Sequence, residues 1–138
     1  MRLATWNVNS IRARADLVAD WLADQQPDIC CLQETKCRDD VFPTETFEDL
    51  GYAVAHHGVD QWNGVAILSR VGLDDVRRGF GGRQPAPFDE ARLIAASCDG
   101  VRVLSVYVPN GRSLDDPHYL FKLVWLERLR GLLIAEDL

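Results

Sequence analysis

The first 34 residues hold the pattern that most restricts the fold: an apolar strand, a helix and a second apolar strand. Residues 2–7 are typical of a strand, Ser10 is placed to cap the following helix, and Pro27 ends that helix. Residues 28–34, DICCLQE, form a short apolar run that is typical of a buried strand. Strand, helix and strand within about 30 residues make a βαβ unit. The two strands should therefore be parallel, with a right-handed crossover.

The rest of the chain is predicted to form antiparallel strands and one long helix. The four apolar runs expected to be strands are residues 52–57, 64–69, 92–98 and 101–108. Asp99 and Gly100 separate the last two runs and are typical of a tight hairpin turn. Asp116 and Pro117 suit the N-cap and the first position of a helix over residues 118–135.

Charge and composition exclude several classes of protein. The net charge of −6 argues against a simple basic nucleic-acid binder. It leaves open an enzyme that holds a phosphate through a divalent cation, because the metal supplies local positive charge. No apolar run approaches the ~20 residues of a membrane span, and the N-terminus lacks the apolar region of a signal peptide. We therefore expect no membrane partner. The four cysteines form no CxxC pair and are typical of packed thiols, which indicates a reducing, cytoplasmic setting.

Polar side chains stand where the two strands of the βαβ unit end. Because parallel strands end at the same edge of a sheet, Asn7 and Glu34 should lie together at the edge where α/β sheets bind ligands. Amide and carboxylate oxygens are hard donors that suit Mg²⁺, and Arg12 in the following helix turn can reach a phosphate. The alternative is structural: Asn7 and Asn9 cap the helix, and Glu34 pairs with Lys36.

Four stretches, LATWNVNSIRAR, PDICCLQETK, NGVAILSR and VYVPNG, together resemble the exonuclease III family of apurinic/apyrimidinic (AP) endonucleases. That family belongs to the endonuclease/exonuclease/phosphatase superfamily, with DNase I and the inositol-polyphosphate phosphatases. The resemblance implies an α/β fold with mixed sheets, part of a four-layer α/β sandwich of the DNase I-like type. It also implies that residues 1–138 are the N-terminal portion of a single domain whose C-terminal half is absent.

The resemblance assigns roles to three residues of the proposed site. Glu34 matches the carboxylate that binds catalytic Mg²⁺ or Mn²⁺, and Asn7 matches the asparagine that helps to hold the metal. No small-molecule cofactor is implied. Tyr107 matches the tyrosine that approaches the scissile phosphate, where its phenol stabilises charge or positions the nucleophile. The structural alternative for Tyr107 is a strand-end tyrosine with a solvated hydroxyl.

The same resemblance implies a DNA partner. The family acts on duplex DNA with abasic sites or 3′ ends, as an AP endonuclease and 3′–5′ exodeoxyribonuclease in base excision repair. Arg12 matches an arginine that contacts the DNA backbone, and Asn63, Asn110 and Arg112 fall in loops that lie along the DNA. His56 and His57, at the end of a predicted strand, are interpreted as surface or supporting groups.

The chain departs from the family in what it lacks. We find no GDxN motif, which carries the base or water-positioning Asp, and no SDH motif with its essential His. Half a sandwich should leave the inner face of one sheet uncovered. One interpretation is a segment of a metal-dependent repair nuclease that is inactive alone. The others are a non-catalytic remnant that binds DNA or a partner, and a phosphoesterase acting on a small phosphate ester.

Overall fold

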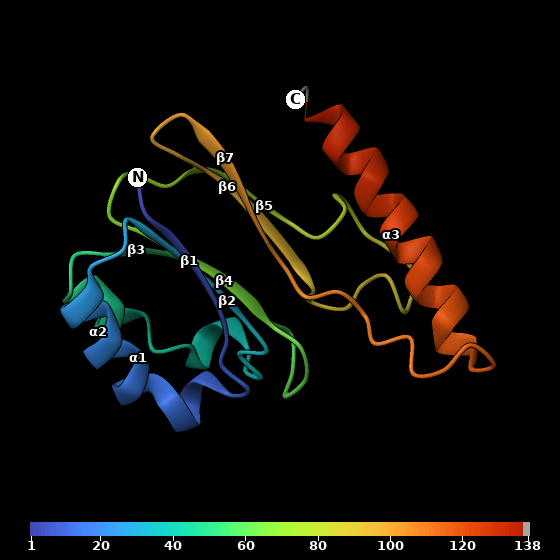
Figure 1. Cartoon of the computed structure of the whole chain (residues 1–138), viewed down its shortest axis with the longest axis horizontal. Helices are drawn as coiled ribbons and strands as arrows, with labels where there is room; N and C mark the ends of the chain where they lie inside the picture. Colours follow the sequence, from blue (N-terminus) through green and yellow to red (C-terminus); the bar gives the residue numbers. More distant parts are fainter. Residues whose placement is uncertain (137–138) are drawn as a thin grey trace. The chain divides into compact units, whose positions relative to one another are not determined.

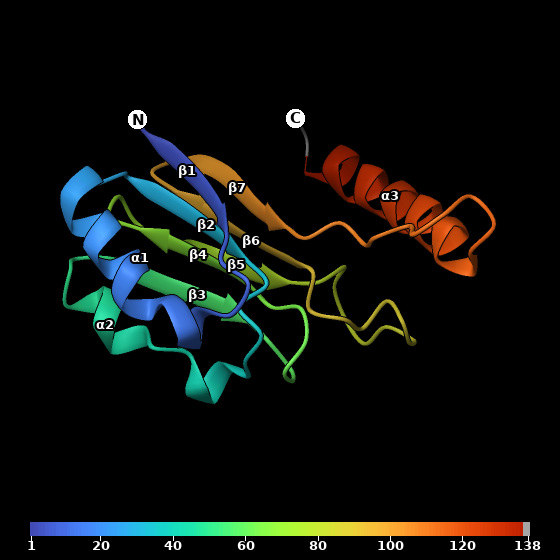
Figure 2. The same ribbon diagram turned by 60° about the horizontal axis from the view of Figure 1, so that its bottom comes forward.

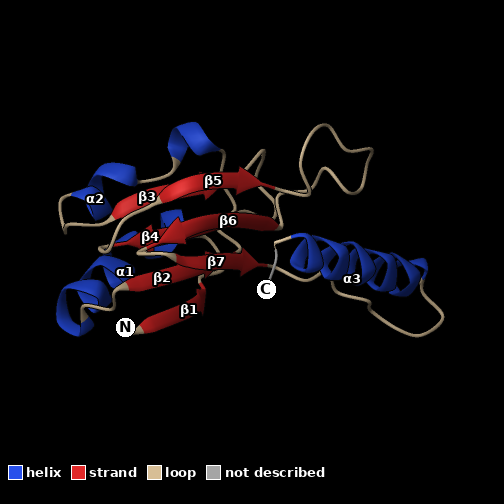
Figure 3. Cartoon of the chain, turned by 90° about the horizontal axis from the view of Figure 1, so that it is seen from above, coloured by secondary structure: helices blue, strands red, loops and turns tan. Residues whose placement is uncertain are grey.

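The computed structural model describes residues 1–136, and the chain divides into two compact units. The first unit comprises residues 1–79 and 90–107, and the second comprises residues 80–89 and the chain from Val108 onward. All strands found in the described residues, drawn red in Figure 3, belong to the first unit. None of the helices within residues 1–136 is long and apolar enough to span a bilayer.

The first sheet contains the predicted βαβ unit. Its strands, in spatial order, are β1 (Leu3–Asn7), β2 (Ile29–Gln33), β4 (Val65–Ser69) and β3 (Ala53–His57). Strands β1 and β2 are parallel and are joined by α1 (Ile11–Gln25), while β4 is antiparallel to both of its neighbours. Ser10 caps α1 as predicted, because its hydroxyl accepts a hydrogen bond from the backbone N–H of Ala13 at 3.3 Å.

The second sheet is antiparallel, with strand order β5 (Asp74–Arg78), β6 (Leu93–Cys98) and β7 (Val101–Val106). The predicted hairpin joins β6 to β7, and Asp99 and Gly100 both have positive φ, at 50° and 78°. Strand β5 was not predicted, because its sequence DDVRR is charged and largely exposed. Two short helical segments were not predicted either: a 3₁₀ turn at Asp39–Val41 and α2 (Thr44–Glu48).

The two sheets of the first unit face each other, and α1 and α2 cover the outer face of the first sheet (Figures 1 and 2). One apolar cluster lies between the sheets and includes Ile67 of β4 and Ile94 of β6. The other lies beneath the helices and includes Leu22 of α1 and Leu68 of β4. The expectation that the inner face of one sheet is uncovered is therefore wrong, because the first unit contains strands of both sheets and their apolar side chains pack against each other.

The second unit consists of α3 (Pro117–Ala135) and a loop packed on it. Asp116 caps α3 as predicted and accepts a hydrogen bond from the backbone N–H of His118 at 2.9 Å. The ring of Phe80 meets the buried Trp125 edge to face at 5.4 Å between centroids. Of the closing segment IAEDL, the last two residues lie outside the described residues.

The mixed α/β fold with two sheets confirms the predicted fold class. The assignment of all 138 residues to one portion of a single domain stays a prediction.

Candidate functional site

Three of the residues predicted to form a site lie together at one edge of the first unit. Asn7 ends β1 and Glu34 directly follows β2, its parallel neighbour, where Asn7 is paired with Gln33. The Asn7 Nδ2 donates a hydrogen bond to Glu34 Oε1 at 2.9 Å. Tyr107 follows β7 of the second sheet, and its hydroxyl donates a hydrogen bond to the same carboxylate. The structure thus brings Asn7, Glu34 and Tyr107 together from both sheets.

A polar link between the sheets lies beside this site. Gln33 Nε2 donates hydrogen bonds to Thr5 Oγ1 at 2.9 Å and to Ser105 Oγ at 3.2 Å. The Ser105 hydroxyl in turn donates to the backbone carbonyl of Leu32 at 3.0 Å. Because Gln33 precedes Glu34 and Ser105 lies two residues before Tyr107, this link fixes the position of β7 relative to β2.

The segment that carries Glu34 is bound tightly to its neighbours through its backbone. The Glu34 carbonyl accepts from the N–H of Ser10 at 2.8 Å, and the Lys36 N–H donates to the carbonyl of Asn63 at 2.8 Å. Glu34 and Lys36 have φ of 54° and 55°, a left-handed conformation that non-glycine residues rarely adopt. Such a conformation persists where the surrounding structure imposes it, and it is often found at functional sites.

The surroundings of Glu34 favour its charged form. Partial burial raises the pKa of Glu34, but hydrogen bonds from Asn7 and Tyr107 and the charge of Lys36 together lower it below its usual value. The Lys36 ammonium lies 3.5 Å from Glu34 Oε2 and also donates to Asn9 Oδ1 at 2.6 Å. Burial and the Glu34 charge raise the pKa of Tyr107, so its phenol stays protonated.

Tyr107→Phe is expected to raise the pKa of Glu34, because the substitution removes a hydrogen bond donated to the carboxylate. Carbon-13 NMR titration of the Glu34 carboxyl group measures this. Tyr52→Phe is the matched control, since the Tyr52 hydroxyl donates to the carbonyl of Pro27, before the start of β2. An equal change in the pKa of Glu34 in both variants, or no change in either, would refute the contact between Tyr107 and Glu34.

The site offers a divalent cation such as Mg²⁺ or Mn²⁺ one ionised carboxylate, that of Glu34. Within residues 1–136 no three His, Cys, Asp or Glu side chains cluster in a way that could hold a metal. An ion at Glu34 would therefore take one carboxylate from the protein, with water and phosphate oxygens in its other positions, as Mg²⁺ commonly does. Asn7 turns its amide nitrogen to Glu34, and its Oδ1 accepts from the backbone N–H of Asn9 at 3.2 Å. This arrangement suits Asn7 to orient the carboxylate; its direct ligation of a metal stays a prediction.

Two residues that the sequence did not reveal connect Tyr107 to Asn63. The Arg92 guanidinium lies over the Tyr107 ring, 4.9 Å from its centroid, and forms a 2.8 Å ion pair with Glu90. Asn63 Nδ2 donates to the same Glu90 carboxylate at 3.2 Å. The sequence places Glu90 and Arg92 two residues apart, but no local pattern relates them to Tyr107.

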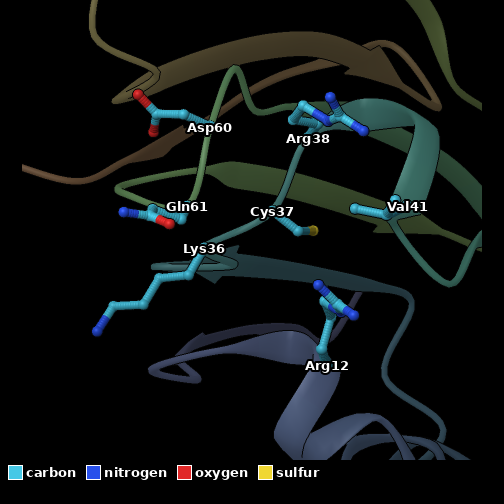
Figure 4. Close-up of a pocket in the computed structure, with 7 residues that line it drawn as sticks. All are labelled: Arg12, Lys36, Cys37, Arg38, Val41, Asp60 and Gln61. Atoms are coloured by element: carbon cyan, nitrogen blue, oxygen red, sulfur yellow. The ribbon is translucent and has the colours of Figure 1, made fainter.

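A basic pocket of about 300 Å³ lies beside α1. Figure 4 shows Arg12 pointing from α1 toward Cys37, with Arg38 on the other side of the pocket. Lys36 adds a third cation, and Asp60 is the one carboxylate among the lining residues. Within residues 1–136 the Arg12 guanidinium has no hydrogen-bond or ion-pair partner, so it is available for an anion.

The remaining predicted DNA-contact residues belong to the second unit. Asn110 and Arg112 line a separate pocket of about 300 Å³ together with Lys122. The Asn110 side chain accepts from the backbone N–H of Arg112 at 2.7 Å, and the Arg112 guanidinium lies 3.9 Å from the Asp116 carboxylate. Their contact with DNA stays a prediction.

His56 should make the stability of the first unit depend on pH. Burial lowers the pKa of His56 to about 4, from an ordinary 6.5, although Asp39 opposes this shift. The unfolded chain binds the proton near pH 6.5 and the folded chain only near pH 4. The free energy of unfolding should therefore fall on acidification across this window, by up to ~3 kcal/mol from this residue.

Urea denaturation at several pH values between 6.5 and about 4 measures this effect. His56→Phe should remove most of the dependence of the free energy of unfolding on pH in this range. Some of this pH dependence should remain in the variant, because burial also lowers the pKa of His57. An unchanged pH dependence in His56→Phe would contradict the assignment.

Comparison with protein families matches residues 4–137 to the Endonuclease/Exonuclease/phosphatase family. Exodeoxyribonuclease III of Haemophilus influenzae is 36% identical over 119 residues, which cover 82% of this chain and 43% of that protein.

Two solved structures are also similar. An AP endonuclease from Archaeoglobus fulgidus is 44% identical with a TM-score of 0.88, over 96% of this chain and 51% of that one. A 3′ phosphatase from Neisseria, bound to product DNA hairpin, is 40% identical with a TM-score of 0.90, over 99% of this chain and 52% of that one. The chain thus spans about half the length of the relatives that it matches.

Proposed function

The chain belongs to the Endonuclease/Exonuclease/phosphatase family, and we propose that it supplies the metal-binding half of an exonuclease III-type DNA nuclease. The complete protein would hydrolyse phosphodiester bonds in duplex DNA, at abasic sites and at 3′ ends. The relatives named as exodeoxyribonuclease III and AP endonuclease support this substrate class.

One observation carries the proposal: Glu34, Asn7 and Tyr107 converge at the carboxyl ends of strands from two sheets. A strand-end tyrosine with a free hydroxyl would not contact the carboxylate. Capping asparagines would bond to the first turn of α1, but Ser10 makes that contact instead. Glu34 does pair with Lys36, as the structural alternative held. The convergence still favours a site, because that pair does not account for the contacts of Asn7 and Tyr107 with the same carboxylate.

Each of these residues has a distinct task in phosphodiester hydrolysis. Glu34 provides the ionised carboxylate for a divalent cation, and Asn7 orients that carboxylate. Bound Mg²⁺ would supply positive charge that polarises the phosphate. Tyr107 remains protonated, and its one hydroxyl hydrogen, which is donated to the Glu34 carboxylate in this structure, would turn to a phosphate oxygen as negative charge develops there. Arg92, over the face of the Tyr107 ring, holds that ring in place.

DNA binding would use cations that are not paired with the catalytic carboxylate. Arg12, without a partner of its own within the described residues, is suited to a backbone phosphate, with Arg38 across the same pocket. Asn63, Asn110 and Arg112 would contact the backbone from their loops. This local positive charge is compatible with a net charge of −6, because binding depends on the charges at the interface.

An incision assay on duplex DNA with one abasic site, in Mg²⁺, tests the proposal. We predict that residues 1–138 alone do not cleave above a no-protein background, because the family's general-base residues have no match in this chain. Such a base is typically worth ~10²–10⁴-fold in rate. A chimera can join this chain to the portion of the Archaeoglobus AP endonuclease that has no counterpart in it. This chimera should cleave on the 5′ side of the abasic site.

Either of two results would contradict this proposal. The first is a folded chimera that binds the duplex but does not cut it. The second is cleavage by residues 1–138 alone that disappears in Glu34→Gln, since this half would then carry a sufficient site.

A further inference from the structure

Thr35, which follows the proposed metal-binding residue, is fully buried between two residues of unusual backbone conformation. Its neighbours Glu34 and Lys36 both have positive φ, at 54° and 55°. A non-glycine segment with two such residues tends to relax unless its surroundings prevent it. The contacts of the Thr35 side chain therefore bear directly on where the Glu34 carboxylate lies.

The Thr35 hydroxyl contacts His56, a residue of β3 that is 6% exposed. The distance between Thr35 Oγ1 and His56 Nε2 is 2.7 Å. On the other side of the ring, Nδ1 lies 2.7 Å from Asp39 Oδ1, although at an angle poor for a hydrogen bond. The ring stacks on Phe42, with 4.3 Å between centroids and 24° between planes. These contacts hold the imidazole on three sides.

The Asp39 carboxylate favours one direction for the Thr35 hydrogen bond. An ionised carboxylate only accepts hydrogen bonds, so its position 2.7 Å from Nδ1 favours the neutral tautomer with the hydrogen on Nδ1. Nε2 is then an acceptor, and the Thr35 hydroxyl donates to it. Burial keeps the pKa of His56 well below its usual value, so Nε2 remains free to accept at neutral pH.

Close packing leaves Thr35 and His56 little room to move. A Cβ on Gly64, which has a φ of 95°, would overlap the Thr35 hydroxyl. A Cβ on Gly58 would overlap both the Cys37 carbonyl and the His56 ring. The Gly58 N–H also donates to Asp39 Oδ1 at 2.9 Å. The chain thus comes as close to this pair as glycine permits.

We propose that His56 is a positioning residue, which holds the Glu34 carboxylate in its metal-binding position through its hydrogen bond with Thr35. The inference rests on the proposed function, in that Glu34 must bind the divalent cation. His56 touches neither Glu34 nor the reacting phosphate; it acts by keeping residues 34–36 in their left-handed conformation. The adjacent His57 makes no equivalent contact within the described residues, so the role belongs to His56 alone of the pair.

Mn²⁺ binding to the 138-residue chain tests this proposal, with free Mn²⁺ followed by electron paramagnetic resonance. His56→Phe keeps the stacked ring but removes both nitrogens, and Thr35→Val keeps the shape but removes the hydroxyl. Each should weaken Mn²⁺ binding by about 5- to 10-fold, as expected for the loss of one buried hydrogen bond that orders a ligand. The double variant should bind Mn²⁺ no more weakly than either single variant, because both substitutions remove the hydrogen bond between Thr35 and His56.

His56→Gln and His57→Phe are the informative controls. Glutamine can present an oxygen that accepts from the Thr35 hydroxyl, so His56→Gln should recover part of the affinity. His57→Phe should bind Mn²⁺ as the unaltered chain does. Circular dichroism and amide NMR establish that each variant is folded; if His56→Phe does not fold, Thr35→Val, which retains His56, decides the outcome.

The outcomes separate this inference from the function on which it rests. Mn²⁺ binding that is lost in Glu34→Gln but unchanged in folded His56→Phe and Thr35→Val would overturn the positioning role alone. Fully additive losses in the double variant would also overturn it. Mn²⁺ binding that is unaffected by Glu34→Gln would overturn both the proposed function and this inference.

Discussion

Glu34→Gln should lower the Mg²⁺-dependent cleavage rate of the chimera by about 10²- to 10³-fold or more, while it leaves most of the DNA affinity. The substitution preserves the shape of the side chain and its contact with Asn7 but removes the charge that a cation requires. DNA affinity should persist, because neither Arg12 nor Arg38 is bonded to Glu34 within the described residues. The two quantities are measured by single-turnover incision and by fluorescence anisotropy of labelled duplex.

Glu48→Gln is the matched control for this substitution. Glu48 is an exposed residue of α2. Its substitution by glutamine changes the net charge by the same amount but leaves the residues of the candidate site unaltered. If the Glu34→Gln chimera cleaves at the same rate as the Glu48→Gln chimera, Glu34 has no part in catalysis.

Leu68→Ala is expected to have the largest effect on stability. Leu68, at the fourth position of β4, is fully buried in the cluster that joins the first sheet to α1 and α2. Truncation of a buried leucine to alanine typically costs about 2–5 kcal/mol, because the protein loses apolar burial and retains part of the cavity. A single domain is stable by only about 5–15 kcal/mol, so this is a large share of the total.

Leu17→Ala provides the control, since Leu17 lies on α1 with 57% of its surface exposed. Its effect on the free energy of unfolding should stay within about 0.5 kcal/mol. Urea denaturation followed by tryptophan fluorescence compares the two. Equal losses in both variants would contradict the described core.

The features that the sequence predicted correctly depend on contacts close along the chain. The βαβ unit follows from apolar periodicity, and the hairpin follows from Asp99-Gly100. The caps at Ser10 and Asp116 are local hydrogen bonds to the next turn. The proximity of Asn7 and Glu34 follows from the polarity of two parallel strands.

The features that the sequence did not reveal depend on contacts between distant segments. Strand β5 has no apolar alternation, because it is an exposed edge strand of the second sheet. The contact of Arg92 with Tyr107 and that of Thr35 with His56 join residues on different strands or loops. The sequence indicates only a surface or supporting group at His56, because no local pattern tells which of two adjacent histidines is buried.

The position of Mn²⁺ on the chain tests whether this edge of the sheet is a metal site. A crystal of residues 1–138 soaked in Mn²⁺ can locate the ion by its anomalous scattering. We expect an ion bound directly to a Glu34 carboxylate oxygen, beside Asn7 and the Tyr107 hydroxyl. An ion found only elsewhere, with the Glu34 carboxylate bare, would contradict the assignment of this edge as the metal site of a nuclease.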